Sequence, residues 1–133
     1  MKHKIQKVQN TCTRFIFGLK KYDHISSHFA QLQTLNMEER RIVHGLTTMH
    51  KIVKKITPDY LTSKINFHNN LHNYNTRNRN NIVVGVSRTT TYDNSYFPTF
   101  SRLYNNITNT GINMNVTVNT FRKNAKSYVI SRR

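Results

Sequence analysis

Carboxylates hold the metal ions of two-metal phosphoryl-transfer sites, and this chain has only five of them in 133 residues. Glu38 and Glu39 stand where a helix is expected to begin, and the three aspartates are scattered. A two-metal site needs carboxylates that converge on ions about 4 Å apart, but the sequence has no Asp-Asp pair and no Asp-x-Asp. The four glycines are isolated, so no phosphate-cradling loop is expected. These residues alone predict no polymerase, nuclease or nucleotidase site.

Histidine is the other residue type with a metal-binding spacing. His24 with His28, and His68 with His72, are four residues apart, which places two imidazoles on one helix face. Neither first histidine is followed by Glu, and the second pair lies in a stretch without helical period. Because a zinc site needs three or four ligands, we interpret these histidines as exposed polar side chains. We expect neither a metal nor another cofactor.

Three stretches combine cations with aromatic rings: residues 20–22, residues 74–79, and residues 96–104 around Arg102. Cations neutralise a nucleic-acid backbone, and aromatic rings stack on the bases of single strands. The third stretch is more simply explained as core residues. The second is explained almost as well by a solvated loop as by contact with nucleic acid.

The charge balance is the strongest bulk signal. Twenty-one Lys and Arg against five Asp and Glu give a formal charge of +16 on 15.7 kDa. Self-repulsion at this density opposes compaction, and a polyanion relieves it. We rank RNA or DNA first as the partner, an anionic membrane surface second and an acidic protein third. A/T-rich codons explain part of the Lys and Asn content, but they explain the scarcity of acids less well.

Cysteine usage and hydropathy favour an intracellular chain. Cys12 is the single cysteine, so no internal disulfide forms, and its place on an apolar helix stripe predicts a buried thiol. The basic start is not followed by the uninterrupted apolar stretch of a signal peptide. No run approaches the roughly 18 apolar residues of a membrane span. We expect a nuclear or cytoplasmic protein that is not secreted.

The first helix is expected to run to about Gly18. The first 22 residues of the chain contain six Lys and Arg, no acid, and an apolar stripe that needs a partner surface. The stripe consists of Ile5, Val8, Cys12, Phe15, Ile16 and Leu19. Asp23 is predicted to cap a short second helix that turns Ile25, Phe29 and Leu32 inward.

The clearest helix is expected after residue 36. Asn36 and Glu39 have the spacing of a capping box, and Lys54 and Lys55 follow the last turn, which suits the helix dipole. Its apolar stripe consists of Ile42, Leu46, Met49, Val53 and Ile56. Pro58 is then expected at the first position of a short helix that offers Tyr60, Leu61 and Ile65 for packing.

The second half is less regular. Eight of the sixteen residues from 66 to 81 are Asn, which predicts an irregular connection. Residues 82–86 are expected to form a short strand that pairs with residues 89–92. Residues 96–104 are expected to form a helical turn. A final helix over residues 117–130 is expected to bury one face, formed by Val118, Phe121, Ala125 and either Tyr128 or Val129.

These patterns predict a mainly α-helical protein of four to five helices, with an irregular Asn-rich connection and at most one short hairpin. We divide the chain into a helical part (1–65), a polar connection (66–95) and a C-terminal aromatic turn and helix (96–133).

The order of several short motifs resembles the region that follows the reverse transcriptase domain in jockey-like non-LTR retrotransposons. The Pro58-Asp59-Tyr60-Leu61 step is similar to the family's Pro-x-Tyr-Leu, and Asn75-Thr76-Arg77 to a loop that ends in Thr-Arg. Tyr104 stands where the family usually has Trp, and residues 106–108 stand where it usually has Leu-Pro. The other matching segments are residues 4–10, 14–19, 23–26, 39–41, 95–97, 102–105 and 120–128.

The resemblance implies a non-catalytic C-terminal accessory segment of a reverse transcriptase, because the family's catalytic aspartates lie upstream of this region. Its partners would be RNA or DNA and, in a longer chain, the reverse transcriptase domain itself. Two alternatives stay open: a truncated, marginally folded remnant without activity, and a helical module whose first helix docks on a larger protein. The expected nucleic-acid contacts are Lys2, Lys4, Lys7, Arg14, Lys20, Lys21, Tyr74, Arg77, Arg79, Arg122, Lys123 and Lys126.

Overall fold

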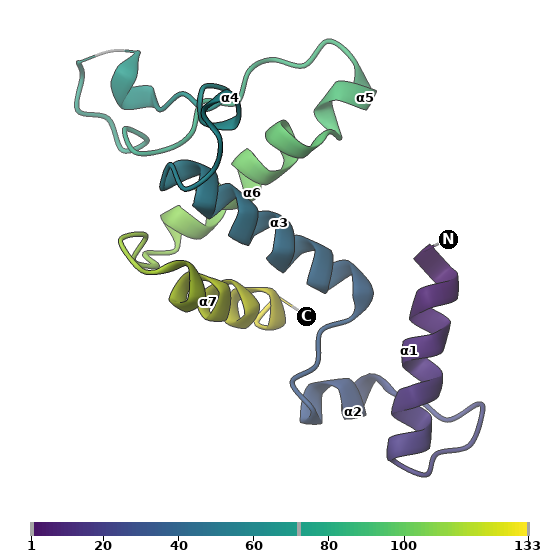
Figure 1. Cartoon of the computed structure of the whole chain (residues 1–133). Coiled ribbons are helices and arrows are strands. Elements are labelled where there is room, and N and C mark those ends of the chain that lie inside the picture. Colours follow the sequence, from purple (N-terminus) through teal and green to yellow (C-terminus); the bar gives the residue numbers. More distant parts are fainter. Residues whose placement is uncertain (1, 72, 133) are drawn as a thin grey trace.

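The computed structural model describes residues 2–71 and 73–132, except for the side chain of Lys2, and it is mainly α-helical, as predicted (Figure 1). The described residues form seven α-helices and one short 3₁₀ helix, two of the α-helices being single turns of four residues. The bounds are α1 Lys2–Ile16, α2 Ser26–Gln31, α3 Met37–Val53, α4 Asp59–Thr62, η1 His68–Asn70, α5 Thr90–Asp93, α6 Tyr96–Asn109 and α7 Val118–Ile130.

Helix α3 is the centre of the molecule, because α6 and α7 both pack against it (Figure 1). Its capping box is confirmed: the Asn36 side chain accepts from the Glu39 amide at 2.8 Å, and the Glu39 carboxylate accepts from the Asn36 amide at 2.8 Å. Leu46 and Met49 of α3 are fully buried, together with Ile107 of α6 and Phe121 of α7. The predicted α3 stripe therefore holds in its centre, whereas Ile56 lies beyond the helix end and is exposed.

His50 joins these three helices from inside the core. Its imidazole stacks on Phe121 of α7, with 4.1 Å between the ring centroids and 5° between the planes. Nε2 lies 3.2 Å from the Val116 carbonyl oxygen, which can only accept, so Nε2 carries the proton. Nδ1 then accepts from the Tyr104 hydroxyl of α6 at 3.1 Å. The fold thereby fixes one neutral tautomer of a fully buried histidine.

Residues 82–86 do not form the expected strand, and the expected hairpin is wrong. Ile82 makes one isolated antiparallel bridge, with Phe67. On its other side the Asn105 side chain of α6 replaces a strand: its Nδ2 donates to the Ile82 carbonyl and its Oδ1 accepts from the Ile82 amide, both at 2.8 Å. Thr89 caps the helical turn α5 instead of pairing. One amide side chain thus satisfies both backbone polar groups of Ile82, and the next amide, of Val83, donates to the Asn66 carbonyl at 2.7 Å.

Residues 96–104 are the start of a full helix and not a single turn. Pro98 occupies the third position of α6, where a backbone N–H has no helical acceptor to lose, so the helix continues to Asn109. The last helix agrees with its prediction: Thr117 caps α7, and Phe121, Ala125 and Val129 are buried. Residues 66–71 and 73–81 are irregular apart from η1 and the bridge at Phe67, as predicted.

The prediction for α1 is wrong in its contacts, although the helix exists and ends at Ile16, just before the left-handed Gly18. Its polar face docks on the body: Gln6 Oε1 accepts from the Met37 amide at 2.9 Å, and Gln9 Nε2 donates to the Leu35 carbonyl at 2.8 Å. The apolar stripe is exposed except for the half-buried Leu19, with Val8 at 63% and Phe15 at 88%, and Cys12 is exposed as well. The first amide of α3 needs an acceptor, and Gln6 supplies one.

Two predicted helix starts are also shifted. Ile25, not Asp23, is the N-cap of α2, and the Asp23 carboxylate instead accepts from the Lys20 amide at 2.8 Å. Phe29 of that helix is buried, but Leu32, directly after it, is 43% exposed. Pro58 is the N-cap of α4 and not its first residue.

Replacing Leu46 with Asp is expected to unfold the protein. Leu46 is fully buried in the α3 core, where an unpaired carboxylate costs several kcal/mol, comparable with the total stability of a small domain. The matched control is Leu71→Asp, since Leu71 is 60% exposed, and it should change stability by about 0.5 kcal/mol or less. Urea unfolding followed by circular dichroism measures both. Equal stability of the two variants would show that this stripe is not a core.

A second prediction concerns pH. Burial lowers the pKa of His50, so the unfolded chain binds a proton there more readily than the folded chain does. This contribution to stability is fully present above about pH 6.5, and it is lost as the pH falls through the lower folded pKa. Between pH 7 and 5 the wild type should lose up to about 1.4 kcal/mol per pH unit more than His50→Gln. Urea unfolding at several pH values measures the difference, and identical pH dependence in both proteins would contradict it.

Candidate nucleic-acid interface

A row of polar and cationic side chains runs along the outward face of α3. Arg40, His44, Thr47 and Lys51 are spaced by four, three and four residues, so they share one face of the helix. The same periodicity places Ile42, Leu46, Met49 and Val53 toward the core. Since the rise is 1.5 Å per residue, the row from Arg40 to Lys51 is about 16 Å long. One helix therefore carries the core on one side and a basic row on the other.

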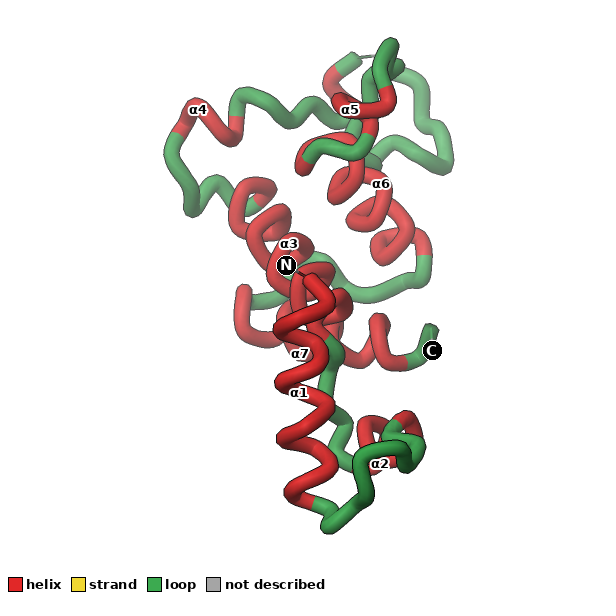
Figure 2. The backbone as a smooth tube through the Cα atoms, turned by 90° about the vertical axis from the view of Figure 1, so that its right-hand side faces the viewer, coloured by secondary structure: helices red, strands yellow, loops and turns green. Residues whose placement is uncertain are grey.

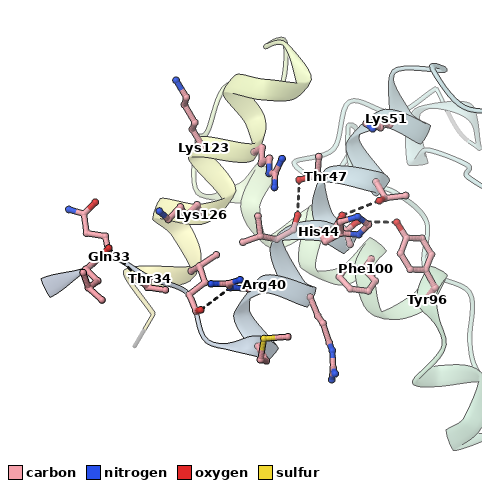
Figure 3. A pocket seen from close by; sticks show the side chains of 18 residues that line it. Gln33, Thr34, Arg40, His44, Thr47, Lys51, Tyr96, Phe100, Lys123 and Lys126 are labelled. Carbon is pink, nitrogen blue, oxygen red and sulfur yellow. Dashed lines mark hydrogen bonds between the residues drawn. The ribbon is translucent and has the colours of Figure 1, made fainter. Parts of the chain in front are cut away.

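Three cations of α7 face the same space. Arg122, Lys123 and Lys126 are exposed, because Phe121 and Ala125 hold the opposite face of α7 in the core. Figure 3 shows Lys123 and Lys126 on one side and Arg40, His44 and Lys51 on the other. The space between them is an open groove of about 930 Å³. At the α6 end it is bounded by Tyr96 and Phe100.

The charge of this groove is entirely positive. Its lining contains six Lys and Arg side chains and no Asp or Glu. Arg40 Nε donates to the Leu35 carbonyl at 3.2 Å, which holds that guanidinium at the groove edge. The other five cations have no hydrogen-bond or ion-pair partner within the part of the chain that the structure describes: Arg41, Lys51, Arg122, Lys123 and Lys126. Unneutralised cations on two facing helices favour a polyanionic ligand.

The aromatic end of the groove is built by a close approach of two helices. Gly45 of α3 faces the Phe100 ring, and a Cβ at Gly45 would lie 2.1 Å from ring atoms. The Tyr96 hydroxyl donates to the Gly45 carbonyl at 2.9 Å, and burial raises the pKa of Tyr96 to about 12. The phenol is therefore neutral at physiological pH, and it adds no negative charge to the groove.

A second hollow lies between α1, α2 and the start of α3, with a volume of about 620 Å³. Its lining includes the carboxylates Glu38 and Glu39 beside His3 and Arg41. Two carboxylates at its wall repel a phosphate backbone. The groove between α3 and α7 is therefore the better anion site.

The predicted contact residues fall into three separate groups. Arg122, Lys123 and Lys126 lie in the groove. Residues 74–79 lie at the opposite end of the molecule from α1 in both Figure 1 and Figure 2. The third group, on α1 and in the turn after it, consists of Lys4, Lys7, Arg14, Lys20 and Lys21. The side chain of Lys2 lies outside the described part of the chain.

Some of these residues have internal roles. Arg14 Nη2 donates to the Asp23 carbonyl at 3.4 Å, and Arg79 Nε donates to the Asn69 side chain at 2.7 Å. Lys4, Lys7, Lys20 and Arg77 are exposed, Tyr74 is 78% exposed, and Lys21 Nζ lies 5.4 Å from the centre of the Tyr22 ring. Their contact with nucleic acid stays a prediction.

Arg102 has a structural role. It forms an ion pair with Asp93 that joins α5 to α6, and its guanidinium lowers the pKa of the Asp93 carboxyl. Phe97, Phe100 and Leu103 pack against the core. The simpler interpretation of Phe97, Phe100 and Leu103, as residues that pack in the core, therefore holds in part, since all three are half-buried and Phe100 also lines the groove.

Four groove residues were missed by reasoning from the sequence: Arg40, Arg41, His44 and Lys51. A signal is present for three of them, because Arg40, His44 and Lys51, with Thr47, repeat the spacing of the neighbouring apolar stripe. Arg40 and Arg41 directly follow two acids, whose charge masks the basic row in the sequence. Both acids lie in the first turn of α3, where the Glu39 carboxylate accepts the capping-box hydrogen bond from the Asn36 amide.

The histidine pairs do not build a metal site in the described structure. His28 packs on Phe17, with 4.4 Å between the ring centroids, and His72 lies outside the described residues. Within residues 2–71 and 73–132, no group of three or more His, Cys, Asp or Glu gathers as metal ligands. In the same residues no helix has the length and hydropathy to cross a membrane.

Comparison with known proteins adds no relative. No family model, curated protein or solved structure matches this chain.

Proposed function

We propose that this protein binds RNA or DNA through the groove between α3 and α7. The observation that carries the proposal is a groove of about 930 Å³ lined by six Lys and Arg and by no acid. Phosphates spaced along a strand would lie against the Arg40–Lys51 row of α3 and the cations of α7. Backbone contacts of this kind position a strand without reading its sequence. We therefore infer a non-specific holding role.

We further propose that the chain is a non-catalytic accessory segment of a retrotransposon reverse transcriptase. The support is its resemblance to the region after that domain in jockey-like elements, together with the roles of the resembling residues. Tyr104, at the position of the family's Trp, is buried and bonded to His50, and Asn105 holds Ile82 in place. In a longer chain, the upstream reverse transcriptase domain would supply the chemistry and this segment would hold template RNA or target DNA.

A matched pair of triple variants tests the binding role. Lys51, Lys123 and Lys126 line the groove, whereas Lys55, Lys64 and Arg88 are exposed elsewhere. Changing either set to Gln removes the same charge. Affinity is measured in filter-binding titrations with single-stranded RNA and duplex DNA at several salt concentrations. In a plot of the logarithm of affinity against the logarithm of the salt concentration, each neutralised phosphate contributes a negative slope of about 0.7 to 0.9. The groove triple should flatten that slope by about two units or more, and the outside triple by less than about one.

Two results would contradict the proposal. Equal effects of the two triples would mean that bulk charge, and not the groove, attracts the strand. Absence of binding by the wild type at low salt would favour an inactive remnant.

A further inference from the structure

Helix α1 carries an exposed apolar stripe that the nucleic-acid groove does not use. Ile5, Val8, Phe15 and Ile16 are all exposed, and none of them lines the groove. Exposed contiguous apolar surface on a small protein marks a binding surface. The stripe of α1 is therefore a candidate binding surface.

The stripe is turned outward by the contacts on the other side of α1. Gln6 and Gln9 bind the start of α3, and Thr13 is buried beside them. At 100° per residue, Val8 and Phe15 lie about 160° around the helix from Gln6 and Thr13. Figure 2 shows α1 in front of the other helices. A flat surface can reach this face without meeting the body of the protein.

The charge beside the α1 stripe and the small area of the stripe restrict which partner can bind it. Lys4 and Lys7 are exposed beside the stripe, and residues 2–22 contain no acid. A second copy of the chain carries the same cations and the same formal charge of +16, so the two copies would repel each other. A nucleic-acid strand is also a poor partner for this stripe, because its phosphate backbone offers no apolar surface. One face of a 15-residue helix is also smaller than the roughly 800 Å² per partner of a stable protein complex. An anionic lipid surface supplies apolar chains and negative headgroups together.

The turn after α1 fits the same surface. Tyr22 is exposed, with the Lys21 ammonium over its ring, and Lys20 is exposed next to it. A ring with a polar edge beside cations is suited to the boundary between acyl chains and headgroups.

We propose that α1 lies flat on anionic membranes, with Val8 and Phe15 among the acyl chains and Lys4 and Lys7 at the headgroups. The groove between α3 and α7 remains open in this arrangement, because α1 does not line it. The proposal is independent of nucleic-acid binding.

Vesicle co-sedimentation tests it with the full chain. The probes are vesicles of phosphatidylcholine containing phosphatidylserine, and vesicles of phosphatidylcholine alone. The variant is Val8→Ser with Phe15→Ser, and the matched control is Leu71→Ser with Val86→Ser, two exposed apolar residues far from α1 in the sequence. We expect the α1 variant to bind the serine-containing vesicles about tenfold less tightly or worse, and the control to bind like the wild type.

A lysine variant, circular dichroism and sedimentation velocity distinguish membrane binding from the alternatives. Lys4→Gln with Lys7→Gln should weaken binding to the serine-containing vesicles as well, and circular dichroism should be unchanged in every variant. Equal vesicle binding by the α1 variant and the wild type would overturn the proposal, since the chain's overall charge would then suffice. Absence of wild-type binding would overturn it in favour of a protein occupant. Wild-type self-association in sedimentation velocity that the α1 variant loses would overturn it in favour of a second copy.

Discussion

The buried His50 imidazole is the contact that ties this small core together. His50 belongs to α3, and its ring contacts the Tyr104 hydroxyl of α6, the Val116 carbonyl just before α7 and the Phe121 ring of α7. Leaving any of these polar atoms unpaired would cost about 1 to 3 kcal/mol, a large part of the stability of such a domain. The neutral tautomer satisfies both ring nitrogens and the phenol at once. The packing of α6 and α7 on α3 therefore depends on one side chain having both its partners.

That packing also creates the basic groove. Because α3 contributes its Leu46 and Met49 face to the core, its Arg40–Lys51 face is turned toward solvent, and α7 is placed so that Lys123 and Lys126 face it. Cations on two facing helices repel one another, and the His50 cluster holds them at this separation. A bound polyanion would relieve the repulsion. The core and the groove are therefore formed by opposite faces of α3 and α7.

Much of the fold follows from local rules in the sequence. The Asn36 capping box and the stripe through Leu46 and Met49 mark α3, and Thr117 with Phe121 and Ala125 marks α7. The ends of α2 and α3 are less visible in the sequence, because Gln33 and Lys55 take the left-handed conformation that glycine usually marks. Ile82 illustrates a different limit: its backbone partner is the side chain of Asn105, more than twenty residues away. No local pattern contains that contact.

The site was predictable only in part, for a similar reason. Charge and periodicity identify Arg122, Lys123 and Lys126 as exposed cations, but their meeting with Lys51 depends on how α7 crosses α3. The stripe of α1 shows the opposite error. Apolar periodicity predicted burial, yet the polar contacts of Gln6 and Gln9 decide which face of α1 meets the body.

Mapping a bound strand onto the protein tests whether the groove between α3 and α7 is the binding surface. In amide NMR spectra of the chain titrated with a single-stranded oligonucleotide, we expect shift changes to gather on residues 40–51 of α3 and 122–126 of α7. Changes confined to residues 74–79 or to α1, with α3 and α7 unaffected, would contradict it.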